Sequence, residues 1–244
     1  IIASLVLALS ISSVNAGWHE TFDTPATPGA ALTFTSDMTW SWWGFGSCEV
    51  ADGHVTLVGG ADLFGNNTSW IQIDQTEGFS NSDPNAVITP DSATIYLKVK
   101  FTTTGTPTDG DQIHVAVATD PVFLTNQNVY TVVSSPVGII GDFYFVPPGT
   151  SNGTPHPAIV YDSWFWEKIV VNGDTVSIWA FADGEAPADT VTWTYTTDNV
   201  AVGAGLPTFI IVGVTDDDSS AVHIDEVWYN ETPTGMSISD DAPI

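Results

Sequence analysis

Hydrophobic and polar residues alternate with a period of two along much of the chain, which predicts β-strands. In residues 93–103, large apolar side chains occupy every second position, and Lys98 and Lys100 lie among the polar ones between them. Residues 112–118 show the same alternation. No stretch between residues 17 and 229 keeps the 3.6-residue period of an amphipathic helix. We therefore expect strands with one buried and one exposed face.

The alternation also assigns side chains to faces near the C-terminal end. In residues 222–228 a continuous strand places Val222, Ile224 and Trp228 on one face and Asp225 on the other. Residues 209–214 (FIIVGV) are apolar on both sides, which is typical of a central strand.

Residues 175–182 carry Trp179 and Phe181 opposite a face that is already apolar. We therefore expect something to cover this second face as well.

Turn signals separate the predicted strands. Asp52-Gly53 is one such signal, and Val171-Asn172-Gly173-Asp174 predicts a type I′ hairpin. We expect roughly 12 to 14 strands and no long helix. The sequence shows no internal repeat and no linker between residues 17 and 229. The prediction is an all-β fold, a two-sheet antiparallel β-sandwich that forms one domain over residues 17–232.

Residues 1–16 form a short apolar segment that admits three interpretations. The apolar run followed by Val14-Asn15-Ala16 indicates the remnant of a signal peptide, with the mature chain starting at Gly17. Alternatively, the segment is a strand donated to a neighbouring subunit. A membrane or pilin-type helix is the third interpretation. Residues 233–244 are polar and are predicted to be a tail or linker.

Charge narrows the range of partners. The chain has 3 Lys+Arg, all of them lysine, and 29 Asp+Glu, which gives a net charge of −26. Nucleic acid and an anionic membrane surface are excluded as partners because both require a basic surface. The single cysteine, Cys48, excludes an internal disulfide and a cysteine-based zinc site. Neutral glycans or copies of the chain itself remain as partners.

Several short motifs occur in an order that matches a known family. They are Glu-Thr-Phe-Asp at 20–23, the segments 49–57 and 166–179, Asp-Gly-Glu-Ala-Pro at 183–187, and Val-His-Ile-Asp-Glu-Val at 222–227. Together they resemble the concanavalin A-like (laminin G-like, lectin/glucanase) jelly rolls, although Cys48 stands where the family pattern has a tryptophan before residue 49. The resemblance implies a jelly-roll sandwich and leaves the activity open.

The resemblance also implies a structural calcium ion. In jelly rolls of this kind an acidic residue of the opening strand and the aspartate of the closing strand often meet at Ca²⁺, which places Glu20 and Asp225 at the site. Calcium prefers several oxygen ligands, many of them carboxylates. Asp216, Asp217 and Asp218 form a second, weaker candidate in a predicted loop. The alternative is that all of these carboxylates are simply solvated.

Catalysis is the least supported interpretation. Glycoside hydrolysis needs two carboxylates across the scissile bond, and the E-x-D-x-x-E string of the glucanase branch is absent. Asp225 and Glu226 are adjacent, so we expect them on opposite faces of a strand. Gln112-Ile113-His114 resembles a strand of jelly-roll alginate lyases, yet the chain has no arginine to neutralise a uronate.

Aromatic side chains provide the positive case for sugar binding, because pyranose rings stack on indole. Trp40 and Trp42 share one face of an extended segment, and so do Trp164 and Trp166. A sandwich of this size also has room for most tryptophans in its core. Strand residues Gln112 and His114 are included as candidate sugar contacts, with an ordinary half-exposed position as the alternative.

We predict a secreted or cell-surface, non-catalytic carbohydrate-binding or adhesion module stabilised by Ca²⁺. The alternative is a structural subunit of an extracellular filament or sheath, assembled by donation of residues 1–16. A glycoside hydrolase or polysaccharide lyase ranks third. Four Asn-x-Ser/Thr triplets are candidate glycan acceptors or ordinary turn residues: Asn66, Asn67, Asn152 and Asn230.

Overall fold

The computed structural model describes most of the predicted sandwich. The described residues are 17–25, 33–35, 39–44, 46–59, 68–73, 92–105, 111–118, 128–135, 138–140, 157–173, 175–186, 193–196, 208–215, 220–234 and 236. The predictions for residues 1–16, for Asn66, Asn67 and Asn152, and for Asp216, Asp217 and Asp218 lie outside these residues.

The described residues form fifteen strands in two antiparallel sheets and contain no helix, which confirms the all-β sandwich. Within the described ranges, therefore, no helix is long and apolar enough to cross a membrane. The count exceeds our expectation because β1, β2 and β10 have three residues each, too few to show alternation. The strands are β1 (Trp18–Glu20), β2 (Thr33–Thr35), β3 (Thr39–Gly44), β4 (Ser47–Ala51), β5 (His54–Val58), β6 (Thr68–Ile73), β7 (Ser92–Thr103), β8 (Gln112–Ala118), β9 (Asn128–Ser135), β10 (Gly138–Ile140), β11 (Phe165–Asn172), β12 (Thr175–Ala182), β13 (Trp193–Thr196), β14 (Thr208–Val214) and β15 (Ser220–Tyr229).

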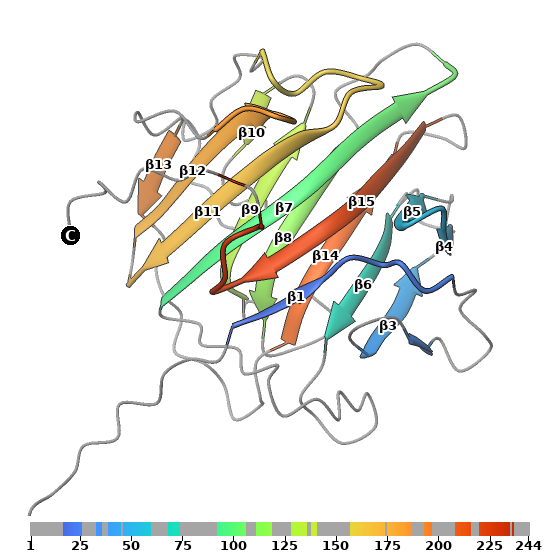
Figure 1. The fold of residues 1–244 in the computed structure, drawn as a ribbon, viewed down its shortest axis with the longest axis horizontal. Coiled ribbons are helices and arrows are strands. Elements are labelled where there is room, and N and C mark those ends of the chain that lie inside the picture. Colours follow the sequence, from blue (N-terminus) through green and yellow to red (C-terminus); the bar gives the residue numbers. More distant parts are fainter. Residues whose placement is uncertain are drawn as a thin grey trace, which may run out of the picture.

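The eight-stranded sheet has the order β13-β12-β11-β7-β15-β5-β4, and β1 pairs with the far end of β15. Figure 1 shows β12, β11, β7 and β15 running side by side across this sheet. Trp18 of β1 lies opposite Tyr229 of β15, so Gly17 lies next to Asn230. The seven-stranded sheet has the order β10-β9-β8-β14-β6-β3-β2, with β14 in a central place as predicted.

The main core lies between the sheets and is built by the predicted alternation. The apolar positions of β7 at Ile95, Leu97, Val99 and Phe101 are all fully buried. The largest fully buried side chains include Trp40, Tyr229, Phe22, Phe165 and Phe209.

Two of the hairpin turns were predicted from the sequence. Asp52 and Gly53 both have positive φ, as a type I′ turn requires. In the second hairpin Asn172 pairs with Thr175, and Gly173 has a φ of 57°.

A β-bulge in β15 corrects the predicted faces of this strand. Ile224 pairs with Val99 and Glu226 with Lys98, so Asp225 is the extra residue. The phase of alternation shifts at this point. Consequently Trp228 lies on the outer face rather than beside Val222 and Ile224. Asp225 and Glu226 both contact Lys98 instead of pointing to opposite sides.

A second, smaller hydrophobic cluster lies on the outer face of the eight-stranded sheet. It consists of Tyr96, Trp166, Phe181 and Trp228, with Trp179 and Met236 packed against it. Pro233 is buried too. The segment that follows β15 therefore folds back onto the sheet, which explains how the second face of β12 is covered (Figure 1). The start of the predicted polar tail is part of the packed body.

Candidate functional site

The structure places the candidate tryptophans Trp40 and Trp42 on the inner side of the sandwich. Trp40 is fully buried, and its Nε1 donates to Glu20 Oε2 at 3.1 Å. Trp42 packs against the core and donates from Nε1 to Ser69 Oγ at 2.6 Å. The prediction that these two rings form a sugar platform is therefore corrected, because their faces are used for packing.

The carboxylates of Glu20 and Asp225 do not share a calcium site. Glu20 faces the core with no exposed area, and its oxygens accept hydrogen bonds from Phe22 N at 2.7 Å and from Trp40 Nε1. Asp225 lies on the outer face, where its Oδ2 is 2.9 Å from Lys98 Nζ. The two groups thus lie on opposite sides of the same sheet and do not fit one Ca²⁺. Within the described ranges, no three acidic, histidine or cysteine side chains cluster as metal ligands.

Trp164 and Trp166 do lie together on the outer face of the eight-stranded sheet. Trp166 on β11 is only 6% exposed, and its Nε1 donates to Asp183 Oδ1 at 3.0 Å. Trp164 immediately precedes β11 and is half-buried. Trp164 is therefore more accessible than Trp40 and Trp166, and unlike Trp42 it lies on the outer face.

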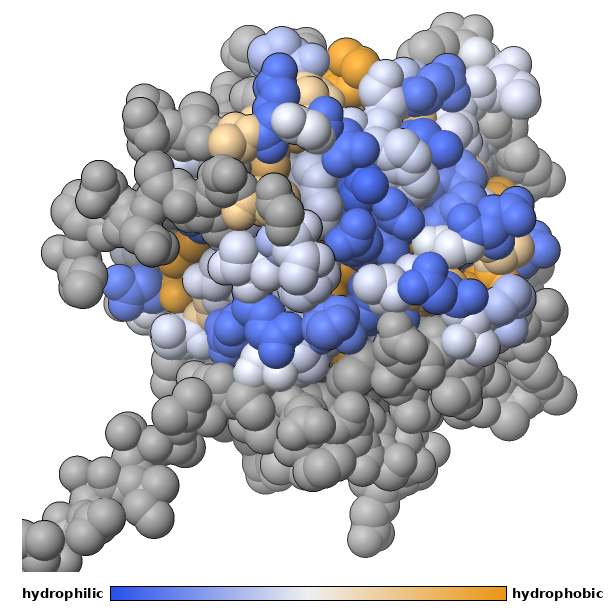
Figure 2. All heavy atoms as spheres, in the orientation of Figure 1, coloured by the Kyte–Doolittle hydropathy of each residue, from blue (hydrophilic) through white to orange (hydrophobic). Residues whose placement is uncertain are grey.

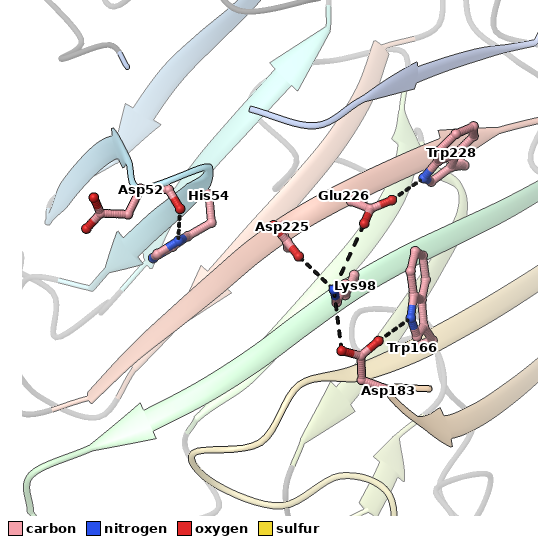
Figure 3. Close-up of polar contacts among 8 residues, drawn as sticks. All are labelled: Asp52, His54, Lys98, Trp166, Asp183, Asp225, Glu226 and Trp228. Atoms are coloured by element: carbon pink, nitrogen blue, oxygen red, sulfur yellow. Dashed lines mark hydrogen bonds and ion pairs between the residues drawn. The ribbon is translucent and has the colours of Figure 1, made fainter. Parts of the chain in front are cut away.

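Three carboxylates converge on Lys98 beside this ring, and we call Lys98, Asp183, Asp225 and Glu226 the Lys98 cluster (Figure 3). The distances from Lys98 Nζ are 2.9 Å to Asp225 Oδ2, 3.4 Å to Asp183 Oδ2 and 4.0 Å to Glu226 Oε1. Glu226 Oε2 also accepts a hydrogen bond from Trp228 Nε1 at 2.8 Å. One positive and three negative charges leave the cluster with a formal charge of −2.

The Lys98 ammonium is held in its charged form. Burial by itself lowers the pKa of Lys98, but the hydrogen bond that Lys98 donates to Asp225 and the charges of Asp225, Asp183 and Glu226 outweigh it, so the net pKa is raised. Ion pairs as well as packing therefore hold the side chains of the Lys98 cluster in position.

A second group of side chains also lies close to Trp164. Lys100 Nζ lies 4.5 Å from the centroid of the Trp164 ring, and the rings of His54 and His223 lie 5.8 and 6.5 Å from it. We call Lys100, His54 and His223 the Lys100 group. His223 bridges two strands, with Nδ1 3.0 Å from Thr56 Oγ1 and Nε2 2.8 Å from Thr102 Oγ1.

His223 stays neutral at ordinary pH. Burial is the main cause that lowers its pKa to about 4, and the neighbouring His54 and Lys100 add to it. The permanent charge of the Lys100 group is therefore that of the lysine.

All three lysines of this acidic chain lie on this one face, each above an aromatic ring. Lys168 Nζ is 4.9 Å from the Trp179 ring centroid and 5.8 Å from that of Tyr96. Figure 2 shows the same side of the molecule, where hydrophilic residues gather over the middle of the sheet and hydrophobic ones occupy small separate areas. The face is thus mixed in character rather than an apolar patch.

A shallow hollow of about 660 Å³ lies next to the Lys98 cluster, around Trp228. The imidazole of His19 stacks on Trp228 with ring centroids 4.3 Å apart, and His19 Nδ1 lies 2.9 Å from Glu231 Oε2. The hollow is lined by His19, Thr21, Glu226, Trp228, Glu231, Thr232 and Thr234.

The remaining candidates lie elsewhere. Gln112 and His114 belong to β8 of the other sheet, so the structure does not bring them together with Trp164; the His114 side chain is outside the described part. Asn230 has a φ of 53° and accepts a hydrogen bond from Thr94 N at 2.9 Å through Oδ1. Its side chain therefore ties the end of β15 to β7.

Sequence reasoning missed most of the site. Alternation did place Lys98 and Lys100 on one face, and the Asp-Gly signal placed Asp183 in a turn. No local pattern showed that β7 lies between β11 and β15. That neighbourhood is what brings Asp183 and Glu226 to the same lysine.

Chemically, the arrangement combines a half-buried indole with fixed hydrogen-bonding groups on its borders. Carboxylates accept hydrogen bonds from hydroxyl groups, and ammonium groups donate them. Such a combination suits a ligand that has one apolar face and many hydroxyl groups at its edges.

Solved structures with a similar fold include lectins and a glycanase. One is the exoplasmic/lumenal domain of VIP36 with Ca²⁺ and Man3GlcNAc bound, with a TM-score of 0.51 and 10% identity over 87% of this chain and 93% of that chain. Another is the Bauhinia forficata lectin in complex with GalNAc, with a TM-score of 0.52 and 12% identity over 90% and 99%. A third belongs to the endo-acting O-glycanases of the human gut microbiota, with a TM-score of 0.50 and 11% identity over 88% and 99%. No protein-family model and no curated protein sequence matches the chain.

Proposed function

We infer that this chain, which folds as a concanavalin A-like jelly roll, is a non-catalytic carbohydrate-binding module that uses the outer face of its eight-stranded sheet. The observation that carries the proposal is Trp164, a half-buried indole with the ammonium groups of Lys98 and Lys100 over its ring and the imidazoles of His54 and His223 in edge contact with it. Stacking on this ring would orient a pyranose, and the charged groups would bind its hydroxyls.

Trp164 is favoured over Trp179, which is also half-buried and also lies under a lysine. Trp164 has several charged and polar groups around it, whereas the lysine is the one charged group against Trp179 within the described part of the chain. Sugar recognition needs both a ring and fixed hydrogen-bonding groups. Only the surroundings of Trp164 supply both.

The non-catalytic part of the proposal rests on chemistry. The Lys98 cluster contains three carboxylates, but each contacts the same ammonium, and Asp183 and Glu226 also accept indole hydrogen bonds. Glycoside hydrolysis needs two carboxyl groups placed across the scissile bond, whereas these three converge on one lysine. The glycanase among the similar structures keeps hydrolysis as an alternative that an activity assay has to address.

Export and calcium belong to the proposal as well. The apolar segment at 1–16 supports a secreted or surface location, in keeping with the exoplasmic/lumenal VIP36 domain. VIP36 was seen with Ca²⁺, so binding should be measured with and without it. The calcium candidates that remain are Asp216, Asp217 and Asp218.

The test compares wild type, Trp164→Ala and Trp179→Ala on a glycan array, followed by calorimetry on the best glycan. We expect Trp164→Ala to weaken binding at least about tenfold and Trp179→Ala to change it less than about twofold. Equal loss in both variants, or no glycan bound by wild type with Ca²⁺ present, would contradict the proposal. Release of reducing sugar from the bound glycan would contradict its non-catalytic part.

A further inference from the structure

Lysines 98 and 100 lie on the same strand and the same face, yet their surroundings differ sharply. Lys98 has three carboxylate partners. Lys100 has no ion pair within the described part of the chain, although the whole sequence contains 29 Asp+Glu. An ammonium without a carboxylate is conspicuous in a chain of net charge −26. It is an available donor next to the ring of Trp164.

Among the described residues, the side chains around Lys100 are imidazole, indole and hydroxyl groups. On the adjacent strand, His223 is fixed by the hydroxyls of Thr56 and Thr102. The ring of His54 lies 5.1 Å from that of His223 and in edge contact with Trp164. None of these groups neutralises an ammonium, and imidazole can donate a hydrogen bond to an anion.

We propose that Lys100 and Trp164 recognise an acidic sugar residue, with the carboxylate or sulfate of that residue bound at Lys100 Nζ and its ring against Trp164. The inference rests on the proposed function and specifies in addition that the bound sugar carries a negative charge. The Lys98 cluster, with a formal charge of −2, also lies near Trp164 and accepts hydrogen bonds from hydroxyls. Its carboxylates repel an anion, so the acidic group of the sugar is expected at Lys100.

The overall charge limits the ligand to a glycan with isolated acidic residues. A polyanion would extend beyond Lys100 and meet the rest of a surface with net charge −26. A single carboxylate or sulfate bound at one lysine avoids most of that repulsion, because exposed charges more than about 8–10 Å apart are screened at physiological salt.

Lys168 provides a matched control on the same face. It also lies above an aromatic ring and has no ion pair within the described residues. Burial lowers the pKa of Lys168, and Trp179 and Tyr96 occupy the space around its ammonium. Replacing it changes the net charge by the same amount as replacing Lys100, so it separates a local contact from a long-range effect.

The test uses an array that carries the same oligosaccharides in neutral, carboxylated and sulfated forms, with wild type, Lys100→Gln, Lys100→Arg and Lys168→Gln. We expect wild type to bind an acidic form about tenfold more tightly than its neutral parent. Lys100→Gln should remove this preference, so that it binds the acidic and neutral forms equally. Lys100→Arg and Lys168→Gln should retain the preference. A preference for only one of the two acidic forms supports the inference and identifies the anion.

Several results would overturn the inference while leaving the proposed function intact. These are equal binding of neutral and acidic forms by wild type, equal loss of preference in Lys168→Gln, and an undiminished preference in a folded Lys100→Gln. Folding is checked by the melting temperature of each variant. If wild type binds no glycan of any form, the proposed function itself fails, and this inference fails with it.

Discussion

At the scale of single residues, Glu20 illustrates how a buried carboxylate serves the fold. Its two oxygens accept hydrogen bonds from Phe22 N and Trp40 Nε1, and Phe22 has a φ of 53°, a conformation that is uncommon for a bulky residue. The carboxylate thus holds the turn after β1 and fixes Trp40 of β3 in the core.

We predict that Glu20→Gln lowers the free energy of unfolding by about 2 kcal/mol, because the amide nitrogen cannot accept one of the two hydrogen bonds. Glu49→Gln, the same change at an exposed position of β4, should cost less than about 0.5 kcal/mol. Both are measured by denaturant unfolding in CaCl₂ and again in EDTA. A cost for Glu20→Gln that disappears in EDTA would instead identify Glu20 as a calcium ligand.

His223 supplies a pH dependence that can be traced to one side chain. Its folded pKa of about 4 lies below the ordinary 6.5, so the unfolded chain binds more protons between these values. The stability tied to neutral His223 is therefore fully present above about pH 6.5 and is lost as the pH falls towards 4 and below.

We expect wild type to lose about 1–2 kcal/mol more than His223→Gln between pH 7 and pH 4.5, a value reduced for the partial exposure of the ring. Denaturant unfolding at both pH values measures this difference. If wild type and His223→Gln lose the same free energy of unfolding between the two pH values, groups other than His223 cause the loss of stability in acid.

At the scale of elements, the bulge in β15 determines the composition of the site. Without it, Asp225 and Glu226 would lie on opposite faces, and Trp228 would point into the core. One extra residue places both carboxylates near Lys98 and moves Val227 and Tyr229 into the core in place of their neighbours. The Lys98 cluster is thus a consequence of strand register.

We predict that Lys98→Met destabilises the fold by about 1–3 kcal/mol at neutral pH, because three carboxylates then face one another without a cation. Adding Asp225→Asn should restore part of the loss.

The stability that Lys98 contributes also depends on pH. The folded pKa of Lys98 is raised above 10.5, so the lysine contributes fully below that pH and its contribution is lost as the pH rises through the folded pKa. Unfolding measured from pH 8 to about pH 11.5 should show wild type and Lys98→Met converging at the alkaline end. A constant difference between them would rule out the charge explanation.

The same elements show what the sequence could and could not predict. Alternation in β7 correctly divided Leu97 and Val99 from Lys98 and Lys100, because each strand residue points to one side of the sheet. The bulge was not visible, since residues 222–228 can be read as one continuous alternation. A bulge depends on the partner strand, and strand partners are set by the packing of the whole sheet.

The site depends even more on distant contacts. Glu20 and Trp40 looked like a calcium ligand and a sugar platform because each was judged by its residue type and local spacing. Their hydrogen bond joins β1 of one sheet to β3 of the other. Trp164 and Trp166 were correctly placed on one face, but only the structure distinguishes the buried ring from the half-buried one.

At the scale of the whole molecule, the net charge of −26 opposes the compact state. Most carboxylates have no lysine available to them, since the chain has only three. Salt screens this repulsion, with a Debye length of about 30 Å at 0.01 M and about 10 Å at 0.1 M.

We therefore predict that the melting temperature rises by at least about 3 °C when NaCl is raised from about 0.02 to 0.5 M. Potassium chloride should act equally, because the effect depends on ionic strength. A fall in melting temperature with salt would show that ion pairs such as those of the Lys98 cluster outweigh the general repulsion.

The pairing of β1 with β15 has a mechanical consequence. Trp18 lies opposite Tyr229 at the end of the pair where Gly17 and Asn230 meet, so residues 17 and 230 lie side by side. A force that pulls residues 17 and 230 apart would load the hydrogen bonds of this short strand one after another, as in a zipper, and would peel β1 from the sheet at low load.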